Sequence, residues 1–197
     1  MPKGDINMTA RIILLNGVGS AGKTSIAAAL QNLTAEPFLR MEMDMFLSMM
    51  PAALQNHPDG LSFDTTMRDG KPNVLAKTGP VAERSLNGMR HAVAAMAAAG
   101  NNLIVDEVIF GDIATESGNP MADYRRLLAP YHLLTVGVFA SLDVLEERER
   151  QRGDRMIGLA RSQYDMVHRA MVYDLKVDTT DASPEECAAI IKNYFSL

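Results

Sequence analysis

Short apolar runs alternate with longer segments of helical periodicity along this chain. The apolar runs, each expected to form a buried strand, are Arg11–Leu15, Phe38–Met43, Leu103–Val108, Leu133–Val138 and Leu175–Val177. Helical patterns lie between and after them, at about residues 22–33, 80–99, 120–128, 141–152, 157–173 and 184–195. Because such alternation is typical of a parallel sheet covered by helices, the pattern predicts an α/β fold with five parallel strands and helices on both faces.

Residues 57–79 interrupt this alternation. Asp69-Gly70 lies near the middle of this segment, within the run Phe63–Pro72, and such a pair is a strong signal for the tight turn of a β-hairpin. The segment is too short to form a domain of its own. We therefore expect a single domain over residues 1–197, with 57–79 as a hairpin inserted over the side of the sheet where a substrate would bind.

Composition and charge narrow the class of protein. The 197 residues are 47% hydrophobic and carry a net charge of -5, which gives no overall attraction to nucleic acid or to an anionic membrane. No stretch approaches the ~20 apolar residues of a membrane span. Cys187 is the only cysteine, which excludes an internal disulfide and suits a reducing compartment. We expect a cytoplasmic protein that binds neither nucleic acid nor membranes. Its oligomeric state stays open, and a homo-oligomer is possible.

One octapeptide carries the most specific chemical signal. Residues Gly17–Thr24 read Gly-Val-Gly-Ser-Ala-Gly-Lys-Thr and match the phosphate-loop (P-loop) pattern G-x-x-x-x-G-K-[ST], between a predicted strand and a predicted helix. Backbone N–H groups of such a loop cradle phosphate oxygens, while Lys23 would reach the β- and γ-phosphates and the Thr24 hydroxyl would bind Mg²⁺. The predicted nucleotide-binding residues are Gly17, Val18, Gly19, Ser20, Ala21, Gly22, Lys23, Thr24 and Ser25.

Carboxylates follow two of the predicted strands. Asp106 and Glu107 end the apolar run that begins at Leu103, and an acid in this position of a P-loop protein helps to hold Mg²⁺. We expect Asp106 to join Thr24 at the metal, and the role of Glu107 stays open between a metal-linked acid and a solvated one.

Asp44 lies just past the second predicted strand, between Met43 and Met45. Because open parallel sheets bind ligands beyond the carboxyl ends of their strands, Asp44 should face the same crevice as the P-loop. There it could orient an acceptor hydroxyl and take its proton. The alternative is an N-cap for a helix that starts near Met45.

Arginines gather around the pair Gly153-Asp154. Guanidinium groups match the oxygens of a phosphoryl group, and a glycine hinge suits a lid that closes. Interspersed glutamates indicate that part of this segment is an ion-paired helix surface, to which we assign Arg150. Residues 148–161 are therefore predicted to form a lid, with three functional arginines, Arg148, Arg152 and Arg155.

Methionine is abundant, with 14 residues in all and five of them between Met41 and Met50. A flexible methionine-lined pocket would suit an apolar, irregular acceptor, although methionines at helical spacing more often belong to the core. Met45, Met49 and Met50 are the candidate acceptor-binding residues.

Together these pieces resemble one family, the chloramphenicol 3-O-phosphotransferases, over roughly residues 11–181. The segments that carry the resemblance are Ile13–Gly17, Ser20–Lys23, Asp44, Met50-Pro51, Phe63-Asp64, Gly79-Pro80, Ile104–Asp106, Arg152–Arg155, Val167-His168 and Tyr173–Thr180. The run Arg152–Arg155 and the run Val177–Thr180 are more specific than the P-loop, which many unrelated families share.

The resemblance implies a P-loop fold of the nucleotide-kinase type that phosphorylates a hydroxyl of a small molecule with ATP and Mg²⁺. It implies that Asp44 is the base, that the lid carries Arg148, Arg152 and Arg155, and that Asp178 and Thr179 lie near the adenine. The chain departs from the family pattern at Phe139-Ala140-Ser141, where Arg-Cys-Asp is expected, and in residues 45–50 and 57–78. Those last two regions should line the acceptor pocket. The resemblance therefore predicts the type of reaction of this chain better than it predicts the identity of the acceptor.

Three functions follow from these observations. The first is a phosphotransferase acting on chloramphenicol or a related antibiotic-like alcohol, with a role in antibiotic resistance. The second is a sugar-nucleotide kinase resembling the zeta toxins, or a metabolite kinase. The third is a nucleotide-dependent binding module that is not a kinase.

Overall fold

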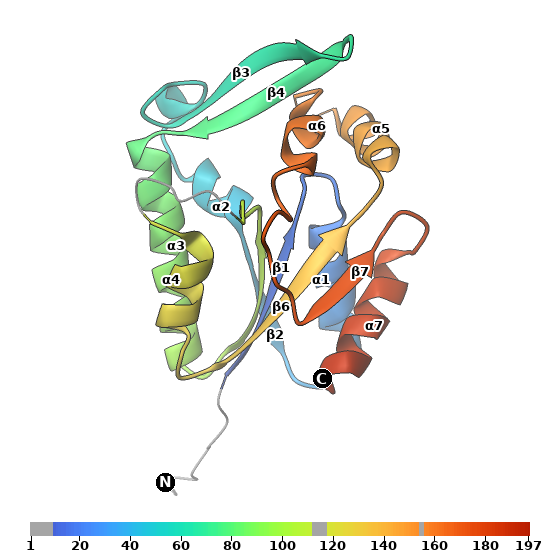
Figure 1. The fold of residues 1–197 in the computed structure, drawn as a ribbon. Coiled ribbons are helices and arrows are strands. Elements are labelled where there is room, and N and C mark those ends of the chain that lie inside the picture. Colours follow the sequence, from blue (N-terminus) through green and yellow to red (C-terminus); the bar gives the residue numbers. More distant parts are fainter. Residues whose placement is uncertain (1–9, 112–117, 154–155) are drawn as a thin grey trace, which may run out of the picture.

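A parallel sheet of five strands forms the centre of the molecule, as the computed structural model shows for residues 10–111, 118–153 and 156–197 (Figure 1). The strand order is β2-β5-β1-β6-β7, and every neighbouring pair is parallel. The strands are β1 (Arg11–Gly17), β2 (Phe38–Glu42), β5 (Asn102–Glu107), β6 (His132–Phe139) and β7 (Leu175–Asp178). The predicted α/β fold with a five-stranded parallel sheet is confirmed.

Helices cover both faces of this sheet. Helices α1 (Lys23–Leu33) and α7 (Pro184–Phe195) pack on one face, and α3 (Pro80–Ala98) and α4 (Pro120–Leu127) pack on the other (Figure 1). Successive residues of β1 point to opposite faces, so Ile13 and Leu15 enter the first core, while Ile12 and Leu14 enter the second. Because both faces are buried, β1 is a continuous apolar run without alternation. No helix of the described ranges is long and apolar enough to cross a membrane.

The remaining elements gather at the carboxyl end of the sheet. They are α2 (Met43–Ser48), the short 3-10 helix η1 (Ala52–Leu54), β3 (Leu61–Arg68), β4 (Lys71–Thr78), α5 (Leu142–Arg152) and α6 (Leu159–Tyr164). Strands β3 and β4 form an antiparallel hairpin, whose turn residues Asp69 and Gly70 both have positive φ, 53° and 72°. This is the conformation that an Asp-Gly pair favours, so the hairpin forms where the sequence indicated it.

The hairpin is attached to α6. The backbone N–H of Val74 donates to the carbonyl oxygen of Gly158 (3.0 Å), and the Ser162 hydroxyl donates to the carbonyl oxygen of Val74. Near the hairpin's end, Arg68 and Asp165 form an ion pair of 2.9 Å. We call the β3–β4 hairpin and α6 together the roof, because Figure 1 places both beyond the carboxyl end of the sheet.

The predicted helix at residues 157–173 is wrong in extent, because only Leu159–Tyr164 is helical. Turns follow, and Ala170 has a positive φ of 55°. Val167 is fully buried in the core although it lies in a turn, so the apolar spacing that suggested a longer helix came partly from turn residues.

Candidate active site

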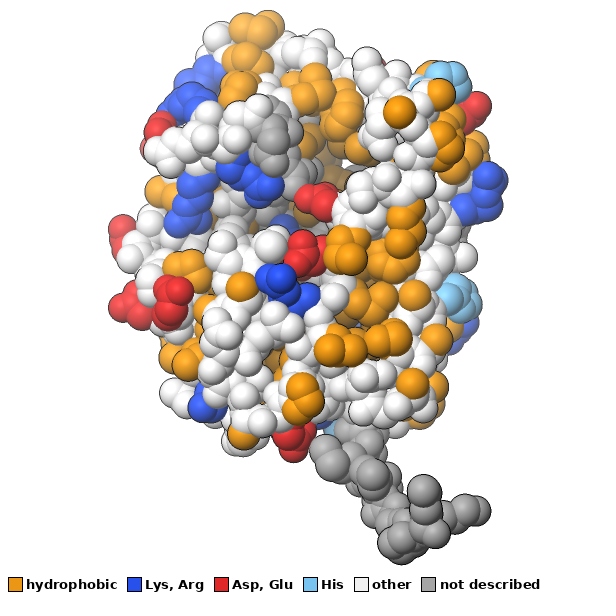
Figure 2. All heavy atoms as spheres, turned by 180° about the vertical axis from the view of Figure 1, so that it is seen from behind, with side chains coloured by type: hydrophobic (Ala, Val, Ile, Leu, Met, Phe, Trp, Pro, Cys, Tyr) orange, Lys and Arg blue, Asp and Glu red, His pale blue; other side chains and the backbone are white. Residues whose placement is uncertain are grey.

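A cavity of about 880 Å³ opens between the carboxyl end of the sheet and the roof. Its lining comes from the P-loop and α1, from α2, from the hairpin, from α5 and α6, and from the residue after β7. Figure 2 shows this hollow from behind, with both basic and acidic side chains near its opening. The elements that the sequence analysis treated separately therefore meet at one site.

The P-loop has the backbone that its glycines permit. Gly22 adopts a φ of +87°, in the left-handed region that favours glycine. A Cβ atom on Gly17 would lie 2.5 Å from the carbonyl oxygen of Val138, so the loop leaves β1 against the neighbouring strand. Gly19, Ser20, Gly22, Lys23, Thr24 and Ser25 line the cavity. Gly17, Val18 and Ala21 do not line it, and of these Val18 and Ala21 are buried core residues.

The Lys23 ammonium is held at the mouth of the loop. Lys23 Nζ donates to the carbonyl oxygens of Gly17 (3.0 Å) and Val18 (3.2 Å) and lies 3.5 Å from Asp106 Oδ1. The Lys23 side chain is only 7% exposed. An almost buried cation beside a loop of backbone N–H groups is an arrangement that fits a polyphosphate.

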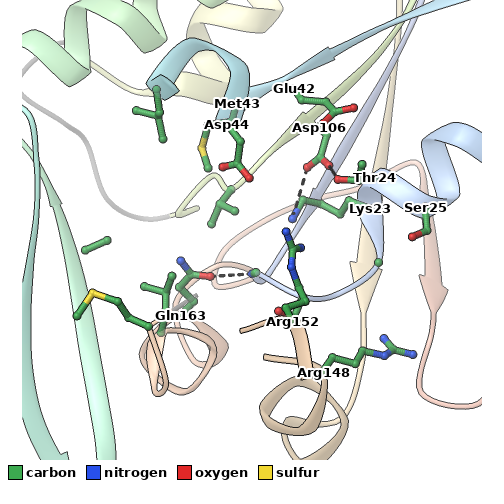
Figure 3. A pocket seen from close by; sticks show the side chains of 18 of the residues that line it. Lys23, Thr24, Ser25, Glu42, Met43, Asp44, Asp106, Arg148, Arg152 and Gln163 are labelled. Carbon is green, nitrogen blue, oxygen red and sulfur yellow. Dashed lines mark hydrogen bonds and ion pairs between the residues drawn. The ribbon is translucent and has the colours of Figure 1, made fainter. Parts of the chain in front are cut away.

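Oxygen ligands suited to Mg²⁺ lie next to this lysine. Thr24 Oγ1 donates a 2.7 Å hydrogen bond to Asp106 Oδ2, and both residues line the cavity (Figure 3). Glu42, at the end of β2, pairs with Asp106 in the sheet register and also lines the cavity. A hydroxyl and two carboxylates are hard oxygen donors of the kind that Mg²⁺ prefers, so the residues present fit the metal. No pattern in the sequence marks Glu42 as a site residue.

Glu107 points away from the cavity, as the alternation along β5 requires. Its carboxylate accepts hydrogen bonds from Arg90 Nη2 (3.2 Å) and from the Tyr124 hydroxyl (2.6 Å), under α3 and α4. The Glu107 side chain is 2% exposed, and burial raises the pKa of its carboxyl group, with Arg90 acting against that shift. Burial together with the charge of Glu107 raises the pKa of Tyr124. Glu107 is therefore neither a metal-linked acid of the cavity nor a solvated one, because it belongs to a buried ion pair with Arg90.

Asp44 lies in the first turn of α2 and lines the cavity. In Figure 3 its carboxylate points into the cavity, toward the side where Lys23 and Arg152 lie. The alternative interpretation of Asp44 as an N-cap is wrong, because α2 begins at Met43 and its N-cap residue is Glu42.

Of the three arginines predicted to be functional, Arg148 and Arg152 lie in the described residues, and they differ in their contacts. Arg148 donates to Thr179 twice, from Nη1 to the hydroxyl (2.9 Å) and from Nη2 to the carbonyl oxygen (2.6 Å). Arg152 lines the cavity from the end of α5, and in Figure 3 its guanidinium points toward Lys23. Arg150 binds Glu147 on the exposed face of α5, as expected for a surface residue. Arg155 lies outside the described residues.

Thr179 ties the end of β7 to the P-loop. Its hydroxyl donates to the carbonyl oxygen of Ala21 (2.9 Å), and the residue is buried and lines the cavity. Asp178, its neighbour, is exposed and lies outside the lining. Its carboxylate accepts the N–H of Thr180 (2.8 Å), which lowers its pKa. Of the two residues expected near the adenine, the structure brings only Thr179 to the cavity.

The candidate methionines do not line the cavity. Met45 and Met49 are 52% and 69% exposed, and Met50 is buried outside the lining. The reason is helical geometry, because Met43 and Leu47 share one face of α2 at a spacing of four residues, while Met45 lies on the opposite face. The apolar side chains that line the cavity from α2, from the hairpin and from the region of α6 are Met43, Leu47, Leu61, Phe63, Ala76, Met156 and Leu159.

Gln163 is a further lining residue that the sequence did not predict. This residue is 7% exposed, lines the cavity from α6, and accepts the backbone N–H of Gly19 on its side-chain oxygen at 2.8 Å (Figure 3). No sequence pattern marks a glutamine for such a contact, which depends on how α6 folds back over the P-loop.

Comparison with known proteins agrees with this geometry. Residues 10–196 match the family described as chloramphenicol phosphotransferase-like protein. The chain belongs to this family. It is accordingly an enzyme, an O-phosphotransferase of the P-loop kinase type. A proposed O-phosphotransferase of Mycobacterium tuberculosis (strain H37Rv) is 31% identical over 193 residues, which cover 95% of this chain and 80% of the relative.

Solved structures of other proteins, two of them kinases, share the fold of this chloramphenicol phosphotransferase-like chain. The Mycobacterium tuberculosis APS kinase, in complex with AMPPNP and APS, superposes with a TM-score of 0.64 at 15% identity, covering 96% of this chain and 99% of that one. A gluconokinase from Sinorhizobium meliloti gives a TM-score of 0.61 at 18% identity, covering 96% and 93%. The tunicamycin resistance protein of Deinococcus radiodurans gives 0.57 at 19% identity, covering 95% and 96%. These likenesses establish the P-loop kinase fold.

Proposed function

We propose that this enzyme transfers the γ-phosphoryl group of ATP, bound with Mg²⁺, to a hydroxyl group of a small and largely apolar alcohol. Chloramphenicol or a related antibiotic-like compound is the first candidate for this acceptor. The proposal rests on one observation. Lys23, Asp44 and Arg152 line the same cavity, and the wall opposite them is apolar (Figure 3).

The donor side of the cavity fits a nucleoside triphosphate. The N–H groups of the cavity-lining P-loop residues Gly19, Ser20 and Gly22–Ser25 and the Lys23 ammonium would hold the phosphates, and Thr24 with Asp106 would hold the metal. Bound there, Mg²⁺ would offset negative charge on the β- and γ-phosphate oxygens. Arg148 and Thr179 lie at the other end of this side, where the nucleoside would extend, and Asp178 stays a prediction for the adenine region.

Asp44 is proposed to accept the proton of the acceptor hydroxyl. The acceptor oxygen forms a bond to the γ-phosphorus while the bond from that phosphorus to the bridging oxygen breaks, and its electron pair leaves with ADP. Lys23, Arg152 and Arg148 would offset charge on the transferring group and on ADP. Arg155 retains its proposed place in this lid by the resemblance. In this account the chain's work is positioning and charge compensation.

The acceptor wall supports a neutral, apolar acceptor. Met43, Leu47, Leu61 and Phe63 supply apolar surface, and Glu42 and Asp44 supply negative charge. Among the described residues, no arginine or lysine comes to the lining from α2 or from the hairpin. A nucleotide sugar carries two phosphates and would need such cations, so these contacts favour the antibiotic-like alcohol over the sugar-nucleotide alternative. A buried, unpaired Cys187 is compatible with the reducing cytoplasm in which we place this activity.

Mass spectrometry of acceptors incubated with the protein and Mg-ATP tests this proposal. Chloramphenicol, other hydroxyl-bearing antibiotics, simple sugars and nucleotide sugars form the panel. The proposal expects a product heavier by one phosphoryl group, formed in proportion to the ADP released. If no acceptor changes the rate of ADP release and no phosphorylated small molecule forms, the proposal is rejected in favour of a nucleotide-dependent binding module.

A further inference from the structure

We propose that Gln163 senses the γ-phosphate and links its presence to the roof over the acceptor. This inference rests on the proposed function, since it concerns the nucleotide that the P-loop would bind. Gln163 lies on α6, 7% exposed, and its side-chain oxygen accepts the N–H of Gly19 at 2.8 Å. It lines the same cavity as Lys23, Asp44 and Arg152 (Figure 3).

Lys23 Nζ contacts the carbonyl oxygen of Val18, the residue before Gly19, so the Gly19 N–H lies at the end of the P-loop where that ammonium would reach the γ-phosphate. In this structure the donor already has an acceptor, because a neutral amide oxygen occupies the position suited to a phosphate oxygen. The identity of that atom is fixed by chemistry, since an N–H can bond only to the oxygen of the glutamine amide and not to its NH₂ group. A phosphate that takes the Gly19 N–H therefore has to displace the Gln163 oxygen.

A glutamine can serve both states because its amide carries an acceptor and two donors. Rotation about the last side-chain bond exchanges the two ends of the amide, and the NH₂ group then faces the loop. A phosphate oxygen at Gly19 would accept a hydrogen bond from that group. Glutamate could accept the Gly19 N–H equally well but could not donate, and its charge would repel the phosphate.

Contacts around α6 connect this switch to the acceptor side. The Glu149 carboxylate accepts the N–H groups of both Gly158 (2.7 Å) and Ala160 (2.8 Å), which fixes the start of α6 on α5. Val74 of β4 bonds to Gly158 and to Ser162, so the hairpin and α6 are held together. The hairpin carries Leu61 and Phe63 into the cavity. A bond from Gln163 to the γ-phosphate would therefore hold the roof, and with it part of the acceptor wall, against the nucleotide.

Binding of AMPPNP and ADP to the wild-type protein and to two variants tests this inference. Gln163→Met has a similar volume and neither donor nor acceptor, whereas Gln163→Glu keeps the bond to Gly19 and removes the donor. We expect the AMPPNP-to-ADP affinity ratio to fall roughly tenfold or more in both variants, as for loss of a hydrogen bond to a charged group. In Gln163→Met the affinity for ADP should stay within about threefold, and Gln31→Met, which removes an amide bonded to the carbonyl oxygen of Phe38, should leave the ratio unchanged.

Hydrogen exchange of the hairpin amides provides a second readout. In the wild-type protein the exchange rates of these amides should differ between the AMPPNP and ADP complexes, because Gln163 would bond to the phosphate in one and to Gly19 in the other, and in Gln163→Met the difference should disappear. A merely structural role of Gln163 would not move either readout.

An unchanged or increased affinity ratio in Gln163→Met would overturn the inference, because Gln163 would then only occupy Gly19 and compete with the phosphate. If Gln163→Met does not fold, the ratio in Gln163→Glu decides in the same way. Normal nucleotide binding with an unchanged ratio would contradict this inference alone, whereas a wild-type protein that binds neither nucleotide would overturn the proposed function as well.

Discussion

Lys23 and Asp106 form an ion pair of 3.5 Å between the start of α1 and the end of β5, where both side chains face the cavity. The same carboxylate accepts the Thr24 hydroxyl through its other oxygen at 2.7 Å. One acid thus contacts both the proposed phosphate-binding cation and the proposed metal-binding hydroxyl. Because the fold itself brings these groups together, the cost of organising them when a nucleotide binds is reduced.

Lys23→Ala should abolish turnover and greatly weaken nucleotide binding, because it removes the almost buried ammonium from the proposed site of the β- and γ-phosphates. The loss should be at least ~1.4 kcal/mol of transition-state stabilisation, which is tenfold in rate. Steady-state kinetics and nucleotide titration measure it, with Lys192→Ala on α7 as the control. A Lys23→Ala protein that keeps more than about a tenth of wild-type activity would contradict the P-loop assignment.

Phe63→Ala and Met49→Ala form a matched pair for the acceptor wall. Phe63 lines the cavity, so its loss should raise the acceptor KM by roughly 5- to 100-fold, as for ~1–3 kcal/mol of apolar contact, and leave the ATP KM nearly unchanged. Met49 is 69% exposed outside the cavity, so Met49→Ala should change neither KM. Both KM values are measured for both variants with the acceptor that the screen identifies. The opposite result, with Met49 affecting the acceptor and Phe63 not, would place the acceptor elsewhere.

Arg90→Met should destabilise the protein by about 3–5 kcal/mol, because it leaves the Glu107 carboxylate buried without its cation. Urea unfolding measures this change. Arg126→Met removes an exposed pair with Asp123 and should cost no more than about 1 kcal/mol. The kcat of folded Arg90→Met should match that of the wild type. A stable Arg90→Met variant with a large loss of kcat would instead connect Glu107 to catalysis.

Stability should fall as the pH is lowered from 7 toward 4, and His168 should cause much of this slope. Burial lowers the pKa of His168 from 6.5 to about 4, and Lys23 and Lys176 act in the same direction. Nδ1 of His168 lies 2.8 Å from the Tyr173 hydroxyl, and Phe139 stacks on the ring. Between these two pKa values the unfolded chain binds a proton that the folded protein does not, so stability rises with pH there and levels off below about 4.

The melting temperature as a function of pH measures this slope. It should be shallower in His168→Gln than in the wild-type protein, while His91→Gln, which changes an exposed histidine, should retain the wild-type slope. Equal slopes in His168→Gln and the wild type would show that other groups control acid stability.

The sequence predicted well wherever a local pattern sufficed. All five strands lie within a few residues of the apolar runs that predicted them, and Asp69-Gly70 marked the hairpin turn. Strand alternation predicts that the side chains of Asp106 and Glu107 point to opposite faces of β5. It does not predict which face holds the site, and this became clear only from the helices that pack on each face.

Long-range contacts explain what the sequence did not reveal. The high methionine content of residues 41–50 suggested Met45 and Met49 as pocket residues. In the structure the face of α2 that lies against the cavity carries Met43 and Leu47 instead. Gln163 reaches Gly19 across 144 residues of sequence, through the path of the chain around Gly158. Such contacts depend on tertiary packing, which local periodicity does not encode.

Transfer of label from γ-³²P-ATP, followed in the wild-type protein and in Asp44→Asn, tests the central claim most directly. In the wild type the label should move to a small organic acceptor. In Asp44→Asn the rate should fall by roughly 10²–10⁴, because an amide cannot accept the hydroxyl proton, while AMPPNP affinity and melting temperature stay close to wild type. Label found only in inorganic phosphate, at a rate that neither the acceptor nor Asp44→Asn changes, would contradict the assignment of this protein as a small-molecule phosphotransferase.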